Sequence, residues 1–226
     1  MGQELSRTVE TYLKIILDES SSSDGGIVPM GALARRMDLT PGTVTTMVKR
    51  FAEDGLLEYI PRKGCRLTDK GTFHGVKLLS KHRLLEFFLV DTLKMDWADV
   101  HEEAESLEHE LSDRVVEALD RFLAYPVVGP HGQPILRTVD EYRAYHPEGI
   151  IPLTCAKKNN SYTIVYVDER FENRSLLHFL GEHKLLPGDT IGVLEYSEGG
   201  GWIEVRTPRG DVLKIGLQNG EHIHVK

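Results

Sequence analysis

Residues 30–68 constrain the fold more than any other part of the chain, because they place two short helices and two short strands in immediate succession. Apolar residues at helical spacing mark the first helix, and a tight turn follows it. Thr40 is a suitable N-cap for the second helix, whose first position is occupied by Pro41. Strands are then expected from Leu56 to Ile60 and from Cys65 to Thr68. This succession predicts a winged helix-turn-helix.

The side chains of this module suit contact with a nucleic acid. In a winged helix-turn-helix the second helix enters the DNA major groove and the hairpin lies along the phosphates, where hydroxyl groups and cations make the contacts. Threonine forms helices poorly, so helix propensity does not explain its abundance here. The residues predicted to contact DNA are Thr40, Pro41, Thr43, Thr45, Thr46, Lys49, Arg50, Arg62 and Lys63. Arg66 and Lys70 add positive charge nearby, and an ordinary three-helix module with threonine caps is the alternative.

The charge of the chain is unevenly distributed. The net charge is −8 at pH 7, yet residues 1–82 hold twelve Lys and Arg against ten Asp and Glu, a local balance of +2, while the remainder carries −10. A locally basic segment in an acidic protein indicates a polyanion-binding module joined to a part without that role. No run of about 18 apolar residues could cross a membrane, and the first residues lack the pattern of a signal peptide. We therefore expect a cytoplasmic protein without membrane association.

The chain from Gly71 to about Ala124 has an almost entirely helical pattern. Asp99 is a suitable N-cap for one helix of this region, which is expected to continue through Leu123. One face of that helix, covering roughly 100° of arc, carries His101, Glu105, Glu108 and His109. Carboxylates on one face repel each other, so imidazoles interleaved with them invite a divalent cation. A solvated acidic helix face is the alternative.

Two observations bear on enzymatic roles. The segment from His101 to Glu105 is not the HExxH motif of zinc proteases, because the second His is missing at i+4. A metal-dependent hydrolase would also need a nucleophile or a further general base, and none is recognisable. Cys65 and Cys155 form no CxxC pair, which argues against a disulfide framework and a thiolate zinc site. We therefore expect a protein that is not an enzyme.

The pattern divides the chain into four parts. Residues 1–74 form the DNA-binding module and residues 75–125 a helical domain, whose first helix is apolar on more than one face and so predicts burial against a second subunit. Residues 126–150 are rich in Pro and Gly and predict a linker, with a short helix near Glu141 to Ala144. Residues 151–226 contain evenly spaced short strands that predict a small barrel. The expected fold class is mainly α with a C-terminal all-β domain.

The chain resembles a known family over nearly its whole length. The resemblance is carried by residues 8–13 (TVETYL), 40–45 (TPGTVT), 54–57 (DGLL), 67–71 (LTDKG), 81–86 (KHRLLE), 97–104 (WADVHEEA), 107–112 (LEHELS) and 130–135 (PHGQPI). Together these segments resemble the diphtheria toxin repressor (DtxR/MntR) family of metal-dependent transcription regulators, in particular its manganese sensors. The resemblance implies that the helical domain binds metal and dimerises, and that the barrel is an SH3-like domain of the FeoA type.

The resemblance also implies a primary, activating metal site formed by Glu105, Glu108 and His109 with Thr11. Glu105 stands where iron-sensing members have Cys and manganese-sensing members have Glu. Thr11 stands where these members have Met and Asp, respectively, and a threonine hydroxyl is a weak neutral ligand suited to holding a metal-bound water. The two carboxylates and the imidazole are a mostly hard donor set, which suits Mn²⁺ or Fe²⁺.

A second, ancillary site is implied as well, with the ligands His82, Glu86 and His101. Lys14 occupies the place of a Glu with which some manganese sensors build a two-metal cluster, so two separated sites are expected. His131 resembles a second-site ligand of manganese-sensing relatives, although Gly129 stands where those relatives have Cys. The ligands that the barrel supplies in iron sensors are not recognisable near Glu172 to Leu176.

The implied function is that of a DNA-binding transcription regulator, most simply a repressor, with Mn²⁺ or alternatively Fe²⁺ as corepressor. It would act as a homodimer on double-stranded operator DNA of metal-uptake and homeostasis genes. Cation binding is expected to draw the first helix towards the helical domain and to fix two recognition helices at a spacing of roughly 34 Å or a multiple of it. The alternatives are an iron-dependent repressor and a metal-independent winged-helix regulator.

Overall fold

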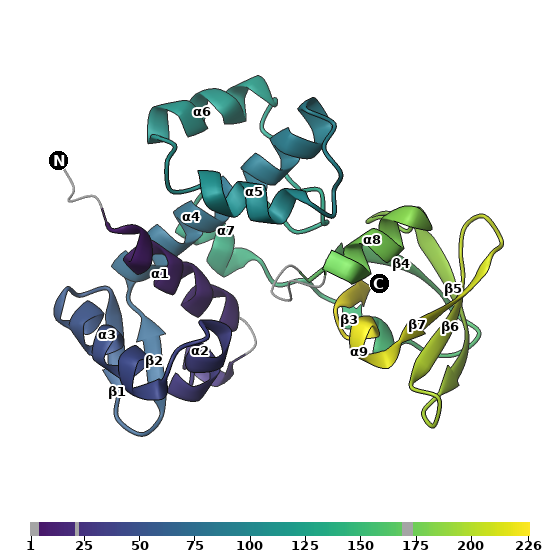
Figure 1. Ribbon diagram of the computed structural model, residues 1–226, viewed down its shortest axis with the longest axis horizontal. Coiled ribbons are helices and arrows are strands. Elements are labelled where there is room, and N and C mark those ends of the chain that lie inside the picture. The colour runs from purple at the N-terminus through teal and green to yellow at the C-terminus, as the bar shows by residue number, and fades with distance from the viewer. Residues whose placement is uncertain (1–4, 21–22, 169–173) are drawn as a thin grey trace. The chain divides into compact units, whose positions relative to one another are not determined.

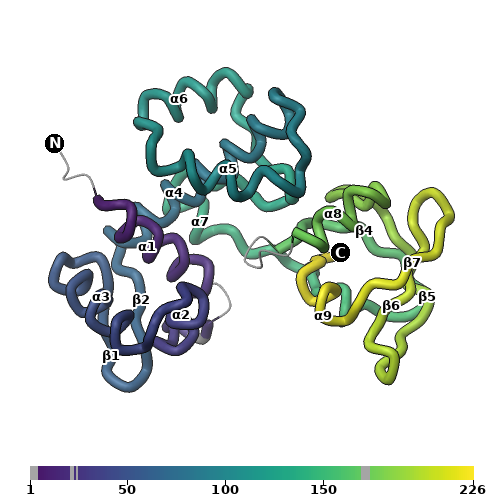
Figure 2. The backbone as a smooth tube through the Cα atoms, viewed as in Figure 1, coloured from purple at the N-terminus to yellow at the C-terminus, as the bar shows by residue number. Residues whose placement is uncertain are grey.

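The computed structural model describes residues 5–20, 23–168 and 174–226 (Figure 1). Contacts divide the chain into two compact units, Met1–Lys81 with Leu136–Tyr145, and His82–Ile135 with His146–Lys226. Helix α4 (Asp69–Phe87) begins in the first unit and ends in the second, as the backbone in Figure 2 shows.

The first unit is the winged helix-turn-helix that the sequence predicts. Its elements are α1 (Arg7–Ser20), a 3-10 turn (Asp24–Gly26), α2 (Met30–Arg36), α3 (Pro41–Glu53), the antiparallel strands β1 (Leu57–Ile60) and β2 (Gly64–Leu67), the first part of α4, and α7 (Val139–Ala144). The predicted cap of α3 is confirmed, because the Thr40 hydroxyl accepts a hydrogen bond from the Thr43 amide at 3.2 Å. The helices enclose a core in which Tyr12 and Phe51 meet edge to face, with ring centroids 5.2 Å apart.

Helix α7 is the short helix expected within the Pro- and Gly-rich segment. Thr138 caps it and forms a capping box with Glu141. The Tyr142 hydroxyl donates a hydrogen bond to the Leu17 carbonyl of α1 at 3.3 Å. This part of the chain therefore packs against α1 within the first unit.

The helical part of the second unit is more divided than the periodicity predicts. After α4 come a π-helical turn (Phe88–Thr92), α5 (Val100–Leu107) and α6 (Asp113–Phe122). The expected single helix from Asp99 through Leu123 is wrong, because α5 ends at Leu107 and the chain turns through residues 108–111 before Ser112 starts α6. The four residues of the predicted stripe therefore do not share one helix face.

Asp99 stands at the N-cap position of α5, but its side chain makes no capping hydrogen bond, so the predicted capping role is wrong. Its carboxylate instead accepts a hydrogen bond from Arg174 Nε at 2.8 Å and lies 3.2 Å from His178 Nε2. Both partners belong to α8 (Arg174–Glu182), which lies in the C-terminal part of the chain.

The C-terminal part of the second unit is all-β apart from short helices, as expected. Its elements are β3 (Ile151–Pro152), a 3-10 turn (Leu153–Cys155), β4 (Ser161–Val167), α8, β5 (Thr190–Ser197), β6 (Trp202–Arg206), β7 (Val212–Gly216), α9 (Leu217–Gly220) and β8 (Ile223–Val225). The six strands are antiparallel, in the order β3-β8-β4-β5-β6-β7 (Figure 1). Register shifts in the pairs β4–β8 and β5–β6 bend the sheet around a core of inward-facing apolar residues. Among the described residues, no helix is long and apolar enough to cross a membrane.

Candidate metal centre

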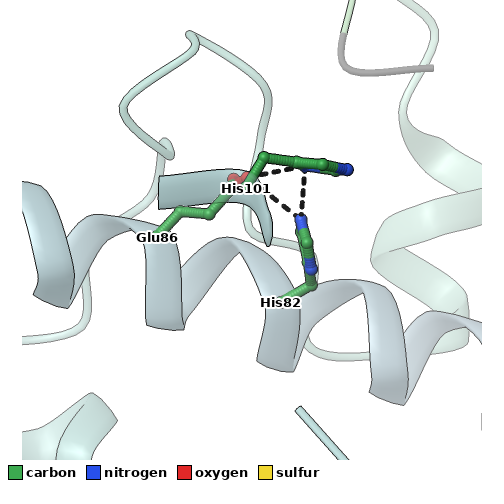
Figure 3. A group of neighbouring side chains, drawn as sticks. All are labelled: His82, Glu86 and His101. Atoms are coloured by element: carbon green, nitrogen blue, oxygen red, sulfur yellow. Dashed lines mark hydrogen bonds and ion pairs between the residues drawn. The ribbon is translucent and has the colours of Figure 1, made fainter. Parts of the chain in front are cut away.

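Three side chains of the second unit converge on one point (Figure 3). His82 and Glu86 project from the same face of α4, and His101 reaches over them from α5. The His82 Nε2 atom lies 3.0 Å from Glu86 Oε1 and 3.0 Å from His101 Nδ1, and the last two atoms are 3.1 Å apart. The structure thus brings together the three residues implied for the ancillary site.

The tautomer of His82 follows from its other ring nitrogen. Nδ1 lies 2.7 Å from Glu108 Oε2, and an ionised carboxylate can only accept, so Nδ1 carries a proton and donates it. In neutral His82 the Nε2 atom then presents a lone pair to Glu86 and His101. Electron pairs that face a common point repel one another unless a proton or a cation lies between them. An imidazole whose second nitrogen donates to a carboxylate is also the arrangement typical of metal ligands.

Two of the three side chains of this centre are buried, while His101 is 20% exposed. The Glu86 and His82 side chains are 0% and 1% exposed. Burial by itself raises the pKa of Glu86, but the nearby imidazoles of His82 and His131, with a hydrogen bond from His101, outweigh it and hold this pKa well below its usual value. The centre is therefore a buried carboxylate next to several imidazoles, of which that of His101 is partly exposed.

Two further imidazoles of the predicted set extend the network. His109 Nε2 lies 3.4 Å from Glu108 Oε1, and His131 Nδ1 lies 3.6 Å from Glu86 Oε2. Their side chains are 4% and 1% exposed. Close contacts are therefore continuous from His109 through Glu108, His82 and Glu86 to His131, so the structure joins residues that the resemblance assigns to separate sites.

Other residues of the predicted set lie apart from this network. Glu105 on α5 is half-buried, and its carboxylate makes no hydrogen bond or ion pair within the part of the chain that the structure describes. Thr11 belongs to the first unit, where its hydroxyl donates to the Arg7 carbonyl at 2.9 Å. Residues 169–173 lie outside the described residues, so the segment Glu172 to Leu176 is described only from residue 174. The roles of Glu105 and Thr11 stay predictions.

The donor chemistry of the centre fits a divalent cation. Imidazole nitrogens and carboxylate oxygens converge in it, and these are ligands that Mn²⁺ and Fe²⁺ accept. Neither cysteine belongs to it, because Cys65 is buried in the core of the first unit and Cys155 lies in the β part of the second. The lone pair of His82 Nε2, which faces the Glu86 carboxylate and the His101 ring, is the structural observation that a cation would satisfy.

Two contacts of this centre have no signal in the sequence. Glu108 and His82 are 26 residues apart and meet only through tertiary packing. His131 Nε2 donates at 2.8 Å to the backbone carbonyl of Trp97, a group that every residue carries and no sequence pattern marks. By contrast, the i, i+4 spacing of His82 and Glu86 was a usable signal for a shared helix face.

The residues predicted to contact DNA lie on the surface of α3 and of the β1–β2 hairpin. All of them are exposed except Thr45, which is half-buried. The hydroxyls of Thr45 and Thr46 donate to the carbonyls of Pro41 and Gly42, at 2.7 and 3.0 Å, so each oxygen can still accept a hydrogen bond. Arg62 occupies the hairpin turn with a φ of 65°.

Nearby cations differ in what they contact. The Lys49 ammonium lies 5.3 Å from the centroid of the Tyr59 ring. Arg66 pairs with Glu58 at 2.5 Å, and Lys70 donates to a backbone carbonyl at 3.1 Å. Arg66 and Lys70, which add positive charge near the predicted DNA-contacting residues, therefore make contacts within the first unit.

Comparisons with known proteins agree with the winged helix-turn-helix and with the candidate metal centre. Residues 4–65 match a family model described as the iron dependent repressor N-terminal DNA binding domain, and residues 68–137 match the iron dependent repressor metal binding and dimerisation domain. The iron-dependent repressor IdeR of Mycobacterium tuberculosis is 38% identical over 133 residues, which are 58% of this chain and 56% of that protein. The chain thus spans about half the length of the curated relatives that it matches.

Solved structures extend the likeness through the β part. A manganese-dependent transcriptional repressor in complex with manganese has a TM-score of 0.84 and 28% identity, covering 96% of this chain and 98% of that one. ScaR with bound Zn²⁺ has a TM-score of 0.77 and 32% identity, with coverage of 96% and 98%. The fold and the matched domains define the class of metal-dependent, DNA-binding repressors. Within that class, the chain belongs to the iron-dependent repressor family, which includes the diphtheria toxin repressor.

Proposed function

We propose that this protein is a DNA-binding transcriptional repressor with Mn²⁺, or alternatively Fe²⁺, as its corepressor. The observation that carries the proposal is the buried convergence of His82, Glu86 and His101 in a chain that also contains a winged helix with an exposed cationic surface. Genes of metal uptake and homeostasis are the proposed targets, because a repressor that senses an ion gives feedback only on genes that control the supply of that ion.

The choice of metal rests on the donor set. The proposed ligands are His82, Glu86, His101, Glu105, Glu108, His109 and His131, with Thr11. Without a thiolate, this set favours Mn²⁺ or Fe²⁺ over a thiolate-seeking metal. Relatives named as iron-dependent and as manganese-dependent repressors both occur, which supports either ion. When bound, the cation would supply the positive charge that the buried carboxylates need.

The residues of the centre can hold two helices in one arrangement. His82 and Glu86 come from α4, His101 comes from α5, and Glu108 follows directly after α5. Satisfying their charges together favours the arrangement of α4 and α5 in which they meet. Because α4 continues into the first unit, the DNA-binding module is joined to the centre by an unbroken helix.

Operator binding is proposed to use α3 and the hairpin. The exposed hydroxyls and cations of α3 suit base edges and phosphates in a major groove, and Arg62 and Lys63 suit phosphates beside it. Ionic contacts of this kind release counterions, so affinity should fall steeply with salt.

A homodimer is proposed from the exposed apolar surface of the helical part. Helix α6 buries none of its residues within the single chain, and its Val115 and Phe122 side chains are 48% and 69% exposed. Leu93, which precedes α5, is likewise 54% exposed. Apolar surface of this kind is typical of protein interfaces, and a two-fold dimer would offer one recognition helix to each operator half-site.

Operator binding by the full chain, with and without a chelator, tests the proposal. We expect binding to require Mn²⁺ or Fe²⁺, and to be abolished by Glu108→Ala or His109→Ala and weakened by His101→Gln. His146→Gln is the matched control, because it changes an exposed imidazole outside the centre. Equal affinity in chelator would contradict the proposal and favour a metal-independent winged-helix regulator.

The contribution of Thr11 has its own test. Operator binding is titrated with Mn²⁺, Fe²⁺, Co²⁺ and Zn²⁺ for the natural protein, Thr11→Asp and Thr11→Met. We expect the Asp variant to favour Mn²⁺ and the Met variant to favour Fe²⁺, since a carboxylate is a harder ligand than a thioether. An unchanged order of preference would remove Thr11 from the ligand set.

A further inference from the structure

Trp97 lies just before α5, yet its indole packs against the hydrophobic core of the barrel strands. The indole Nε1 is buried and has no hydrogen-bond partner among the residues that the structure describes. A buried N–H without an acceptor is unfavourable, so packing must hold this ring in place.

Gly181 on α8 provides the packing surface. A Cβ at this position would lie 2.6 Å from Trp97 Nε1 and 3.3 Å from Trp97 Cδ1, closer than such atoms approach. The indole therefore lies directly on the backbone of α8. Glycine disfavours a helix, and this contact accounts for its presence here.

The same segment is tied to α8 at a second point. Arg174 Nε donates to Asp99 Oδ1 at 2.8 Å, and His178 Nε2 lies 3.2 Å from the same oxygen. Arg174 Nη1 also lies 3.6 Å from Glu102 Oε1 in the first turn of α5. In the sequence, His101 lies between Asp99 and Glu102. Because Arg174 of α8 contacts both acidic residues, α8 fixes the start of the helix that carries the His101 imidazole.

Trp97 reaches the metal centre through its backbone. His131 Nε2 donates to the Trp97 carbonyl at 2.8 Å, which turns His131 Nδ1 towards Glu86 Oε2, 3.6 Å away. The acceptor determines which nitrogen carries the proton and how the ring is oriented. The His131 carbonyl in turn accepts from the Val167 amide of β4 at 2.9 Å.

We propose that α8 is a positioning element for the metal centre: through Trp97 and Asp99 it sets the positions of His131 and His101. A displacement of α8 within the second unit would then change the affinity of the centre for a divalent cation. This makes the barrel a regulator of metal affinity that acts without supplying a ligand from α8. The inference rests on the proposed function, because it requires the centre to bind metal.

Gly181→Ala tests the inference by placing a methyl group where the indole lies. The probe is Mn²⁺ alone, titrated by calorimetry into the full chain. Groups that orient metal ligands contribute about 10- to 100-fold to metal affinity, so we expect Mn²⁺ binding to weaken by about 10-fold or more. Gly199→Ala is the matched control in the same barrel, because a Cβ there meets nothing within 4 Å, and we expect unchanged affinity.

A second substitution separates positioning from general damage to the fold. Trp97→Phe shortens the ring but keeps the backbone carbonyl that His131 contacts. In the double variant with Gly181→Ala, the smaller ring leaves room for the methyl group, so most of the lost affinity should return. Urea unfolding of the same metal-free variants separates the two effects, because a change in positioning weakens Mn²⁺ binding even where the free energy of unfolding is unchanged.

Three results would overturn the inference: wild-type affinity in Gly181→Ala, equal weakening in Gly199→Ala, or no recovery in the double variant. If Gly181→Ala does not fold, Arg174→Ala decides, because weaker Mn²⁺ binding supports the inference and unchanged binding overturns it. Failure of the natural chain to bind Mn²⁺ would overturn the proposed function together with the inference. If the natural chain binds Mn²⁺ and the variants bind it with the same affinity, the inference is overturned and the proposed function stands.

Discussion

The substitution His82→Ala removes the side chain that links two buried carboxylates. His82 donates from Nδ1 to Glu108, its Nε2 lies 3.0 Å from Glu86, and both carboxylate side chains are at most 1% exposed. Water cannot readily replace these contacts at buried atoms. Breaking a buried pair by removing one partner costs about 3–5 kcal/mol, and we expect the second unit to lose that much stability at neutral pH in chelator.

The loss should become smaller in acid. In the natural protein the pKa of Glu86 is held well below its ordinary value of 4.5, so ionised Glu86 contributes stability above that value, and the contribution is lost as the pH falls through the folded-state pKa. Without His82 one attraction that lowers this pKa is gone, while burial still raises it. The folded variant then takes up a proton more easily, so acid costs it less stability than it costs the natural protein.

Leu85→Ala is the matched control on the same helix. Leu85 is 3% exposed and packs in an apolar cluster with Leu89 and Val100. Its truncation leaves a cavity and should cost about 2–5 kcal/mol. Because no charge is removed, this loss should be similar at neutral and acid pH.

Urea unfolding followed by tryptophan fluorescence measures both variants. The two tryptophans, Trp97 and Trp202, both lie in the second unit, so the signal reports on that unit. A deficit below about 1 kcal/mol for His82→Ala at neutral pH would refute the reasoning. The reasoning would also be refuted if the loss in free energy of unfolding of His82→Ala changed as little with pH as that of Leu85→Ala.

Substitutions elsewhere give three further expected outcomes. Thr40→Ala removes the cap of α3 and should destabilise the first unit by about 1 kcal/mol, measured by hydrogen exchange of the α3 amides. Arg50→Ala and Arg62→Ala should each lower the slope of log affinity against log salt by about 1 in operator titrations, and an unchanged slope would place the phosphate contacts elsewhere. Burial raises the pKa of Cys65 to about 12, so a thiol reagent at neutral pH should modify only Cys155 until the protein is denatured, as mass spectrometry would show.

Local signals account for the parts of the fold that the sequence predicts well. Thr40 and Pro41 act on the backbone of the next few residues, and α3 begins where they place it. The strand expected from Tyr162 to Val167 is β4, found one residue longer, because alternation of side chains is also a local property.

The helix α5 shows where local reasoning fails. The apolar period continues past Leu107, so periodicity predicts one helix, whereas Ser112 and Asp113 form a helix start inside the predicted range. The carboxylate of Asp99 is similarly bound by Arg174, a partner 75 residues away that no local pattern indicates. The helix start at Ser112 is a local signal inside a longer apolar period, whereas the role of Asp99 is decided by a long-range partner.

The candidate centre depends both on local sequence signals and on long-range contacts. The spacing of His82 and Glu86 predicts that they share a helix face, and the structure agrees. His101 joined them only through the resemblance, because it lies on a different helix, α5, and no spacing relates it to α4. The tertiary contact between Glu108 and His82 determines the tautomer of His82, and no reasoning from spacing could supply it.

That contact also determines how ligand substitutions must be interpreted. Glu108 and His82 are implied for different sites, yet they share a 2.7 Å hydrogen bond, so loss of operator binding in Glu108→Ala would not by itself show that Glu108 binds metal. A double-mutant cycle of Glu108→Ala with His101→Gln, read as Mn²⁺ affinity, distinguishes the cases. Independent sites give additive changes, whereas sites coupled through His82 should deviate by about 0.5–3 kcal/mol. Since His82 contacts both residues, we expect the changes not to add, and additive changes would show that the two sets bind metal independently.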